Sequence, residues 1–338
     1  MIRASLKWMF LIIGTTIGAG YASGRELWQF FGHESGLAIL LFVIFFSTSC
    51  YVIMKVSYEK QSTHYFPVLH DIIGGRLSRI YDVLIFLYLC TTTIVMIAGS
   101  GAAGQAYHLS EWWGIIFIIL ALIGLFMKGL HGLLSINQYL IPLLLIGLLS
   151  ILLLYSFDQD LNWFSNWQEQ KNWFAAFPFT ALNILPLVAV LGAIGNKIRV
   201  KEEIWFASIG SGLILGFITF VYNQSLMHIA KEINMYEIPL FAILKDYSFA
   251  MLICMTIVLW LAIFTTAAAG LLGIATRLRE IFSLSILKIV MIVLICMLPF
   301  TIFSFSGLIR FLYPLYGMLN LYLLIKLLLY PVWNLFDK

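Results

Sequence analysis

Near the middle of its first hydrophobic segment the chain reads GTTIGAGYASG, residues 14–24. Four glycines and four hydroxyl-bearing residues fall within this run. Each glycine destabilises a helix interior by about 1 kcal/mol relative to alanine. At membrane depth, irregular backbone is tolerated only where protein buries it or where it lines a cavity. The sequence therefore predicts a broken membrane helix with a binding site at the break.

The composition is that of an integral membrane protein. Hydrophobic residues make up 62% of the 338 positions, charged residues make up 11%, and the mean hydropathy is +0.98, which excludes a water-soluble domain. About 30 Å of hydrocarbon requires roughly 20 helical residues. We therefore expect an all-α fold with one transmembrane domain, residues 1–338, and ten spans at 5–32, 36–56, 79–107, 113–128, 133–156, 172–196, 203–230, 248–277, 284–303 and 308–330.

Basic residues are distributed unevenly between the two sides of these spans. Those on one side include Arg3, Lys7, Lys60, Arg76, Arg79, Lys197, Arg199, Lys201, Arg277 and Arg279. Short cytoplasmic loops of membrane proteins carry an excess of lysine and arginine. We therefore expect both termini in the cytoplasm and the loop at 158–171 outside. The net charge of +4 reflects this topology and gives no indication of a nucleic acid partner.

Residues for enzyme or metal chemistry form no known motif in the sequence. The four cysteines fall inside predicted spans without a CxxC pair, and the six histidines form no HExxH. No GxSxG is present, and the glycine run reads GxGxxxG rather than the GxGxxG of dinucleotide-binding proteins. We therefore expect no enzymatic activity and no cofactor apart from a coupling ion.

The loop at 158–171 divides the chain into two halves of five spans, at 5–156 and 172–330. Each half opens with an interrupted helix, the second at TALNILP, residues 180–186. Proline removes a backbone donor, and Asn183 offers a side chain to the loosened backbone. Because five is odd, the second half begins from the opposite face, as in transporters whose inverted repeats meet at the midplane. Taken alone, Pro186 favours an ordinary kink over a site.

A third polar interruption, Thr265-Thr266, lies at mid-depth in the eighth span. Gly18, Asn183 and Thr265 all fall near the centres of their segments, which indicates a single site. Two hydroxyls and the carbonyls of an unwound helix would supply the oxygen shell that a hard cation such as sodium requires. The alternative is that the hydroxyls bond to carbonyls one turn earlier and the small residues serve helix packing.

The run GTTIGAGYASGRE, the two sets of five spans and the small chain size resemble the YkvI-like membrane proteins. These are bacterial relatives of the amino acid–polyamine–organocation superfamily, which has the leucine-transporter fold. The resemblance implies a multi-pass protein of the bacterial cytoplasmic membrane. In sodium-coupled members of the fold, carbonyls of the first helix and a carbonyl and two hydroxyls of helix eight hold the ion. The matching positions here are Gly14, Ile17, Ala262, Thr265 and Thr266.

The same resemblance implies that a substrate carboxylate lies at the free amides of the first break, since N–H groups at a half-helix N-terminus favour anions. The substrate's amino group would meet carbonyls of both interrupted helices. No acidic residue is obvious at mid-depth, so a neutral or hydrophobic amino acid is favoured as substrate. The expected substrate-binding residues are Gly18, Ala19, Gly20, Tyr21, Thr180 and Asn183.

Arg25 and Glu26 follow the break by about a turn toward the outside, where charges require partners or water. An outer gate and an interfacial ion pair that anchors the helix end are equally compatible with this position. Tyr316 and Asn320 are further polar residues in the middle of the tenth span.

Together these features predict a secondary transporter, a sodium-coupled symporter in which spans one, two, six and seven rock against the rest. Two alternatives remain open. The first is proton coupling through Glu26 or His228. The second is a receptor subunit that senses amino acids without transporting them, as the membrane subunits of spore-germinant receptors resemble the same superfamily.

Overall fold

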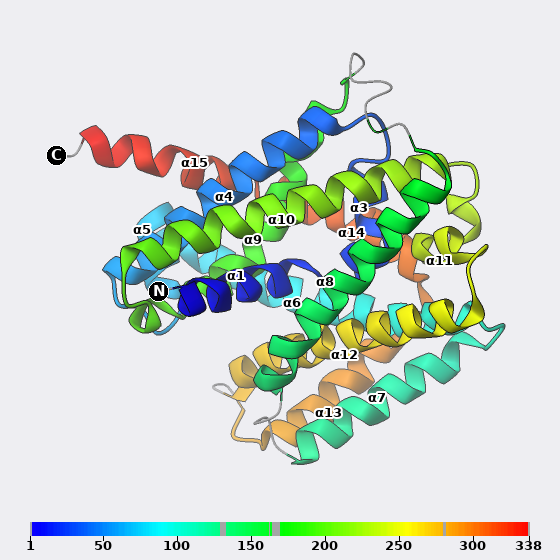
Figure 1. The fold of residues 1–338 in the computed structure, drawn as a ribbon. Helices are drawn as coiled ribbons and strands as arrows, with labels where there is room; N and C mark the ends of the chain where they lie inside the picture. The colour runs from blue at the N-terminus through cyan, green and yellow to red at the C-terminus, as the bar shows by residue number, and fades with distance from the viewer. Residues whose placement is uncertain (1, 129–132, 162, 164–169, 280–281, 337–338) are drawn as a thin grey trace.

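The computed structural model describes residues 2–128, 133–161, 163, 170–279 and 282–336, and every regular element within these ranges is helical (Figure 1). Six of the described helices are long and apolar enough to cross a membrane, and each coincides with a predicted span. They are α4 (Gly36–Glu59), α6 (Gly75–Gln105), α8 (Leu133–Asp158), α9 (Ala176–Leu191) together with the 3₁₀ turn before it, α10 (Lys201–His228) and α12 (Phe249–Arg279).

Shorter helices account for the other predicted spans. The fourth span is α7 (Glu111–Lys128), and the ninth is α13 (Ile286–Met297) with a 3₁₀ turn at Leu298–Ile302. Two further helices, α5 (Phe66–Ile73) and α11 (Pro239–Leu244), lie in the connections. The remaining 3₁₀ turns are Trp173–Ala175, Gly195–Lys197 and Ile233–Met235.

The first span is broken, as the glycine run predicts. Helix α1 (Ile2–Thr16) ends before Ile17 and Gly18, and the chain resumes as α2 (Ala19–Ala22) and α3 (Arg25–Phe30). Between α2 and α3, Gly24 has φ +80°, a left-handed conformation that favours glycine. A Cβ there would also lie 2.7 Å from the Tyr222 hydroxyl oxygen. Both the backbone conformation and the space therefore require glycine at this second bend.

The interruption predicted in the sixth span is not a break. Helix α9 runs without a gap through Pro186. The Thr180 hydroxyl donates to the Ala176 carbonyl and the Asn183 Nδ2 donates to the Phe179 carbonyl, each one turn back within the same helix. Pro186 removes one N–H, the donor that the Leu182 carbonyl would use. One missing hydrogen bond leaves this helix continuous, because packing on both sides holds it.

The tenth span, predicted as one helix, is divided instead. Helices α14 (Phe305–Leu319) and α15 (Leu321–Phe336) are separated at Asn320, which has φ −92° and ψ 1°. The segment that contains α13 and its 3₁₀ turn meets α14 at a bend of 103°. The chain therefore has a second discontinuous span, in the tenth position rather than the sixth.

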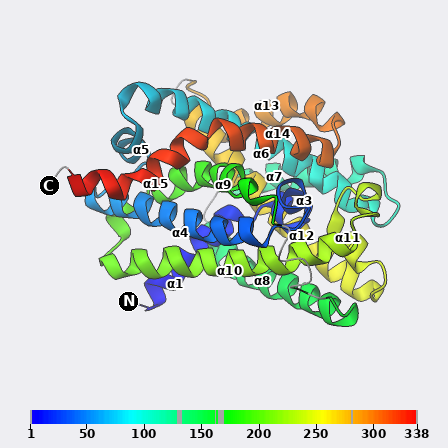
Figure 2. The ribbon, with the colours of Figure 1, turned by 90° about the horizontal axis from the view of Figure 1, so that it is seen from above.

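The helices form two packed groups that meet at the first break. One, which we call the bundle, contains α1, α4, α9 and α10, and the other, the scaffold, contains α6, α7, α12 and α13. Figure 1 shows α4 and α10 above α12, α13 and α7, and Figure 2, seen from above, shows α4 and α10 side by side. Helix α14 contacts α9 of the bundle and α6 of the scaffold. These groups correspond to the spans expected to move and to stay fixed.

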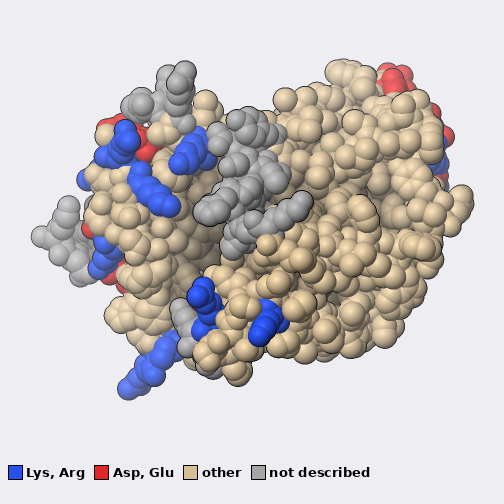
Figure 3. All heavy atoms as spheres, turned by 90° about the horizontal axis from the view of Figure 1, so that it is seen from below, with Lys and Arg blue, Asp and Glu red and all other residues tan. Residues whose placement is uncertain are grey.

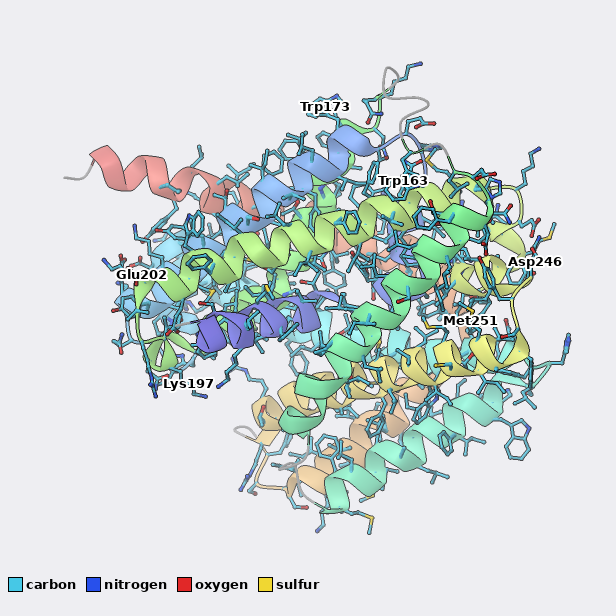
Figure 4. All side chains as sticks on the ribbon, viewed as in Figure 1. Trp163, Trp173, Lys197, Glu202, Asp246 and Met251 are labelled. Carbon is cyan, nitrogen blue, oxygen red and sulfur yellow. The ribbon has the colours of Figure 1, made fainter. Side chains whose placement is uncertain are left out.

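The two ends of the long helices differ in their side chains. Lys197 and Glu202 lie at one end of the molecule, and Trp163, Trp173 and Asp246 lie at the other (Figure 4). Lys and Arg side chains gather toward the first of these ends in the space-filling view (Figure 3). Within the predicted outer loop, residues 162 and 164–169 lie outside the described residues. The arrangement agrees with the alternation of the predicted spans.

Candidate functional site

The break in the first span faces the eighth span. Gly18 has extended backbone, φ −96° and ψ −172°, and its N–H donates to the Thr16 carbonyl at 3.0 Å instead of the Gly14 carbonyl four residues earlier. The Gly14 carbonyl therefore lacks its usual helical donor. A Cβ on Gly18 would lie 3.8 Å from the Thr266 methyl on α12. The break thus lies directly beside the threonine pair.

The carboxylate of Glu26 lies against the other side of the break. The bend at Gly24 folds α3 back on α2, so that a Cβ on Gly20 would lie 2.9 Å from Glu26 Oε2 and 3.0 Å from the Tyr313 ring of α14. Asn183 Nδ2 of α9 donates to Glu26 Oε1 at 3.5 Å. The sequence placed Glu26 a turn beyond the break because the direction of the bend cannot be read from a glycine.

Glu26 has no cationic partner among the residues that the structure describes. Its exposed fraction is 4%, and none of the ion pairs within the described ranges includes it. The long hydrogen bond from Asn183 is a weak compensation for a buried charge. An ionised carboxylate in such surroundings is costly unless a proton or a cation binds to it.

Arg25 points the opposite way, toward the connection between α10 and α11. Its Nε donates to the Glu237 carbonyl at 3.2 Å, and its Nη2 donates to the carbonyls of Ile233, at 3.2 Å, and Tyr236. Nearby, the Leu240 N–H donates to the Ser23 carbonyl at 3.0 Å. The two neighbouring charges are therefore not an ion pair. Arg25 covers the predicted outer side of the break, and its role as a gate stays a prediction.

The proposed sodium ligands on α12 are partly paired with each other. The buried Thr265 hydroxyl donates to the Ala262 carbonyl at 3.2 Å. Gly14 lies one turn before the break, where a Cβ would meet the Ile141 side chain of α8 at 2.6 Å. Among the described residues, no group of three His, Cys, Asp or Glu could hold a metal ion. The structure thus brings Thr266 to the break and leaves Thr265 in the back-bonded arrangement.

Two of the predicted substrate residues face away from the break. The Tyr21 side chain is fully buried, and its hydroxyl contacts the Leu215 carbonyl at 3.1 Å and the Thr219 Oγ1 at 2.8 Å, both on α10. Thr180 bonds within its own helix at 2.5 Å. Gly18, Gly20 and Asn183, in contrast, lie at the break with Glu26 and Tyr313. Tyr313 was not predicted, although it falls on the buried face of α14.

Similarity searches relate the chain to two proteins of Bacillus subtilis (strain 168). It is 52% identical over 330 residues to the uncharacterized protein YyaD, covering 98% of both chains. It is 23% identical over 323 residues to the uncharacterized membrane protein YkvI, covering 92% of both. No protein-family model matches the sequence.

Solved structures show the same fold at low sequence identity. A mutant of the Eremococcus coleocola manganese transporter matches with TM-score 0.62 and 12% identity over 96% of this chain and 78% of that one. Mhp1, a nucleobase-cation-symport-1 family transporter with bromovinylhydantoin bound, matches with TM-score 0.56 and 16% identity over 92% and 74%. The predicted leucine-transporter-like fold is therefore confirmed. The chain is a multi-pass membrane protein distantly homologous to YkvI, and it belongs to the family of Bacillus subtilis YyaD.

Proposed function

We propose that this chain is a secondary active transporter that exchanges protons for a small solute bearing an amino group, in first place an amino acid. One observation carries the proposal: a buried carboxylate without a cation, Glu26, lies at the break of the first span. Intramembrane carboxylates are rare and mark ion and proton pathways. The fold, in which broken helices bind solutes near the midplane, supports the same function.

A single carboxylate with two occupants couples their movements. When Glu26 is ionised and binds neither a proton nor an ammonium group, a change of access leaves its bare charge in a low-dielectric environment, which is unfavourable. A proton or an ammonium group removes that cost. The carrier therefore changes access when either is bound, and it exchanges one for the other. In this scheme the carboxylate of an amino acid substrate binds the amides of Ala19 and Gly20, next to its ammonium at Glu26.

Sodium coupling is a second candidate, and the contact between Gly18 and Thr266 favours it. This contact places α12 where the first-span carbonyls of Gly14 and Ile17 are freed. The Thr265 hydroxyl would have to turn away from the Ala262 carbonyl to bind an ion. Glu26 needs no such rearrangement to accept a proton, so we place proton coupling first.

Flux into liposomes under separately imposed gradients tests the proposal. The purified protein would be offered radiolabelled alanine, leucine and ethylamine with a proton gradient, a sodium gradient, or neither. We expect an outward flow of protons to drive uptake. Protons and solute molecules should move in equal numbers and opposite directions. Uptake that needs sodium and ignores the proton gradient would replace proton coupling with sodium coupling. Saturable binding without flux under any gradient would indicate a receptor.

A further inference from the structure

Gly20 of α2 has two oxygens from different helices beside it. A Cβ at this position would lie 2.9 Å from Glu26 Oε2 of α3 and 3.3 Å from Tyr313 Oη of α14. A carbon of the same ring, Tyr313 Cε2, would lie 3.0 Å away. Tyr313 therefore presents the edge of its ring that carries the hydroxyl, and it presents this edge to the residue against which Glu26 packs.

Both of these oxygens lack a hydrogen-bond partner among the described residues. Tyr313 is only 4% exposed, and Asn183 bonds to the other oxygen of Glu26, Oε1. The unpaired side-chain atoms that the described protein fully encloses belong to Ser47, Ser49, Asn223 and Asn320. Glu26 Oε2 and Tyr313 Oη are not among these enclosed atoms, so each borders open space. A buried tyrosine hydroxyl usually has a partner, and its absence here points to a ligand.

Two other tyrosines of this region have hydroxyls that bond within the protein. Three residues after Tyr313 on α14, the Tyr316 hydroxyl lies 2.9 Å from Thr91 Oγ1 of α6. The Tyr21 hydroxyl lies 2.8 Å from Thr219 Oγ1 of α10. The protein thus satisfies these two hydroxyls and leaves that of Tyr313 open beside Glu26.

The carboxylate and the phenol suit ligand groups of opposite charge. A carboxylate accepts hydrogen bonds and favours a cationic donor, and a phenol donates its O–H most strongly to an anion. An ammonium group therefore fits Glu26, and a carboxylate fits Tyr313. Because both protein oxygens adjoin Gly20, the two charged groups of one solute must be close together. A single carbon separates them in an α-amino acid, whereas a longer chain separates them in γ-aminobutyrate.

We propose that Tyr313 selects α-amino acids: its hydroxyl donates to the solute carboxylate while Glu26 Oε2 accepts from the solute ammonium group. This role of Tyr313 rests on the proposed function for the part that Glu26 plays. It narrows the solute from any small amine to one whose carboxylate lies next to its ammonium group. A hydrogen bond to a charged group is about twice as strong as a neutral one, so loss of the hydroxyl should weaken binding about tenfold.

Thermal stabilisation of the purified protein by solutes tests this role without requiring flux, because a solute that binds the folded state raises Tm. Alanine, γ-aminobutyrate and ethylamine, which lacks the carboxylate, would be titrated in turn. We expect the wild type to bind alanine about tenfold more tightly than the other two solutes. In Tyr313→Phe the affinity for alanine should fall about tenfold, and that for ethylamine should stay within about twofold. Tyr316→Phe, whose lost hydroxyl bonds to Thr91, is the control and should keep the preference for alanine.

Binding and flux together distinguish the role of Tyr313 from the proposed transport. Equal weakening of alanine and ethylamine in Tyr313→Phe would overturn the role, as would equal affinity of the wild type for alanine and γ-aminobutyrate. The wild-type comparison decides the matter even if Tyr313→Phe does not fold. A preference for alanine that requires Tyr313, in a protein without flux under any gradient, would keep the role and overturn the transporter. Flux of alanine and ethylamine that is unchanged in Tyr313→Phe would keep the transporter and overturn the role.

Discussion

The two sides of the first break, Glu26 with Asn183 and Thr265 with Thr266, differ in how well their polar groups are satisfied. On the α9 side, a carboxylate is buried with one hydrogen bond of 3.5 Å and no cation. On the α12 side, the Thr265 hydroxyl has an ordinary bond to the Ala262 carbonyl at 3.2 Å. Buried polar groups that lack partners are costly, and their retention points to a ligand. This difference makes Glu26, and not the threonine pair, the first candidate for the residue that binds the coupling ion.

Glu26→Gln should give the largest effect. The amide keeps the size of the side chain but can neither take up a proton nor neutralise an ammonium group. Loss of a buried charge from a charge pair lowers affinity severely, so we expect exchange to fall about 100-fold. The measurement is proton-driven uptake in liposomes, with Glu59→Gln, an exposed residue of α4, as the matched control. Undiminished exchange in Glu26→Gln would make Thr265 and Thr266, and not Glu26, the first candidates for the coupling site.

Gly20→Ala should disturb the same side through sterics alone. The added methyl would lie 2.9 Å from Glu26 Oε2 and 3.0 Å from the Tyr313 ring, so the carboxylate must move. Overpacking of this kind costs about 1–3 kcal/mol, and we expect roughly tenfold slower exchange and a lower Tm. Gly124→Ala on α7 is the control, since nothing lies within 4 Å of a Cβ there. If both variants behave alike, close approach at Gly20 is unimportant.

Asn183→Leu should have a smaller effect. The substitution removes the hydrogen bond to Glu26, which at 3.5 Å is at the limit of the geometry, and keeps the branched shape of the side chain. A hydrogen bond contributes about 1 kcal/mol, which corresponds to roughly fivefold in uptake at low solute concentration. Asn223→Leu, at a buried asparagine of α10, controls for loss of an amide elsewhere in the bundle. If Asn183→Leu and Asn223→Leu show equal uptake, Asn183 does not belong to the site.

Backbone and side chain differ in how well the sequence predicts them. The glycine run predicted the break at Ile17 and Gly18, because glycine lowers helix stability wherever it occurs. Pro186 did not break α9, because tertiary packing offsets the loss of one hydrogen bond. Asn320 was recognised as polar at mid-span, but asparagine alone does not distinguish a helix end from a helix interior.

The directions of side chains were beyond the sequence. Glu26 faces the break and Arg25 faces away because Gly24 takes a left-handed conformation, and a glycine permits either hand equally. Tyr21 bonds to α10 because two segments 194 residues apart are adjacent. The composition of the site followed from local pattern. Its orientation followed from long-range contacts that no local pattern contains.

Thr265→Ala combined with Thr266→Ala should give the smallest effect under a proton gradient. The Thr265 hydroxyl is bonded back to the Ala262 carbonyl of its own helix and contributes little, so uptake should stay within about twofold of the wild type. The same double variant measured under a sodium gradient gives the sharpest comparison of the two sides, because sodium would need both hydroxyls. Loss of uptake in the double variant with retention in Glu26→Gln would assign coupling to α12. The reverse pattern would assign it to Glu26, and loss in both would mean that ion and solute require both sides of the break.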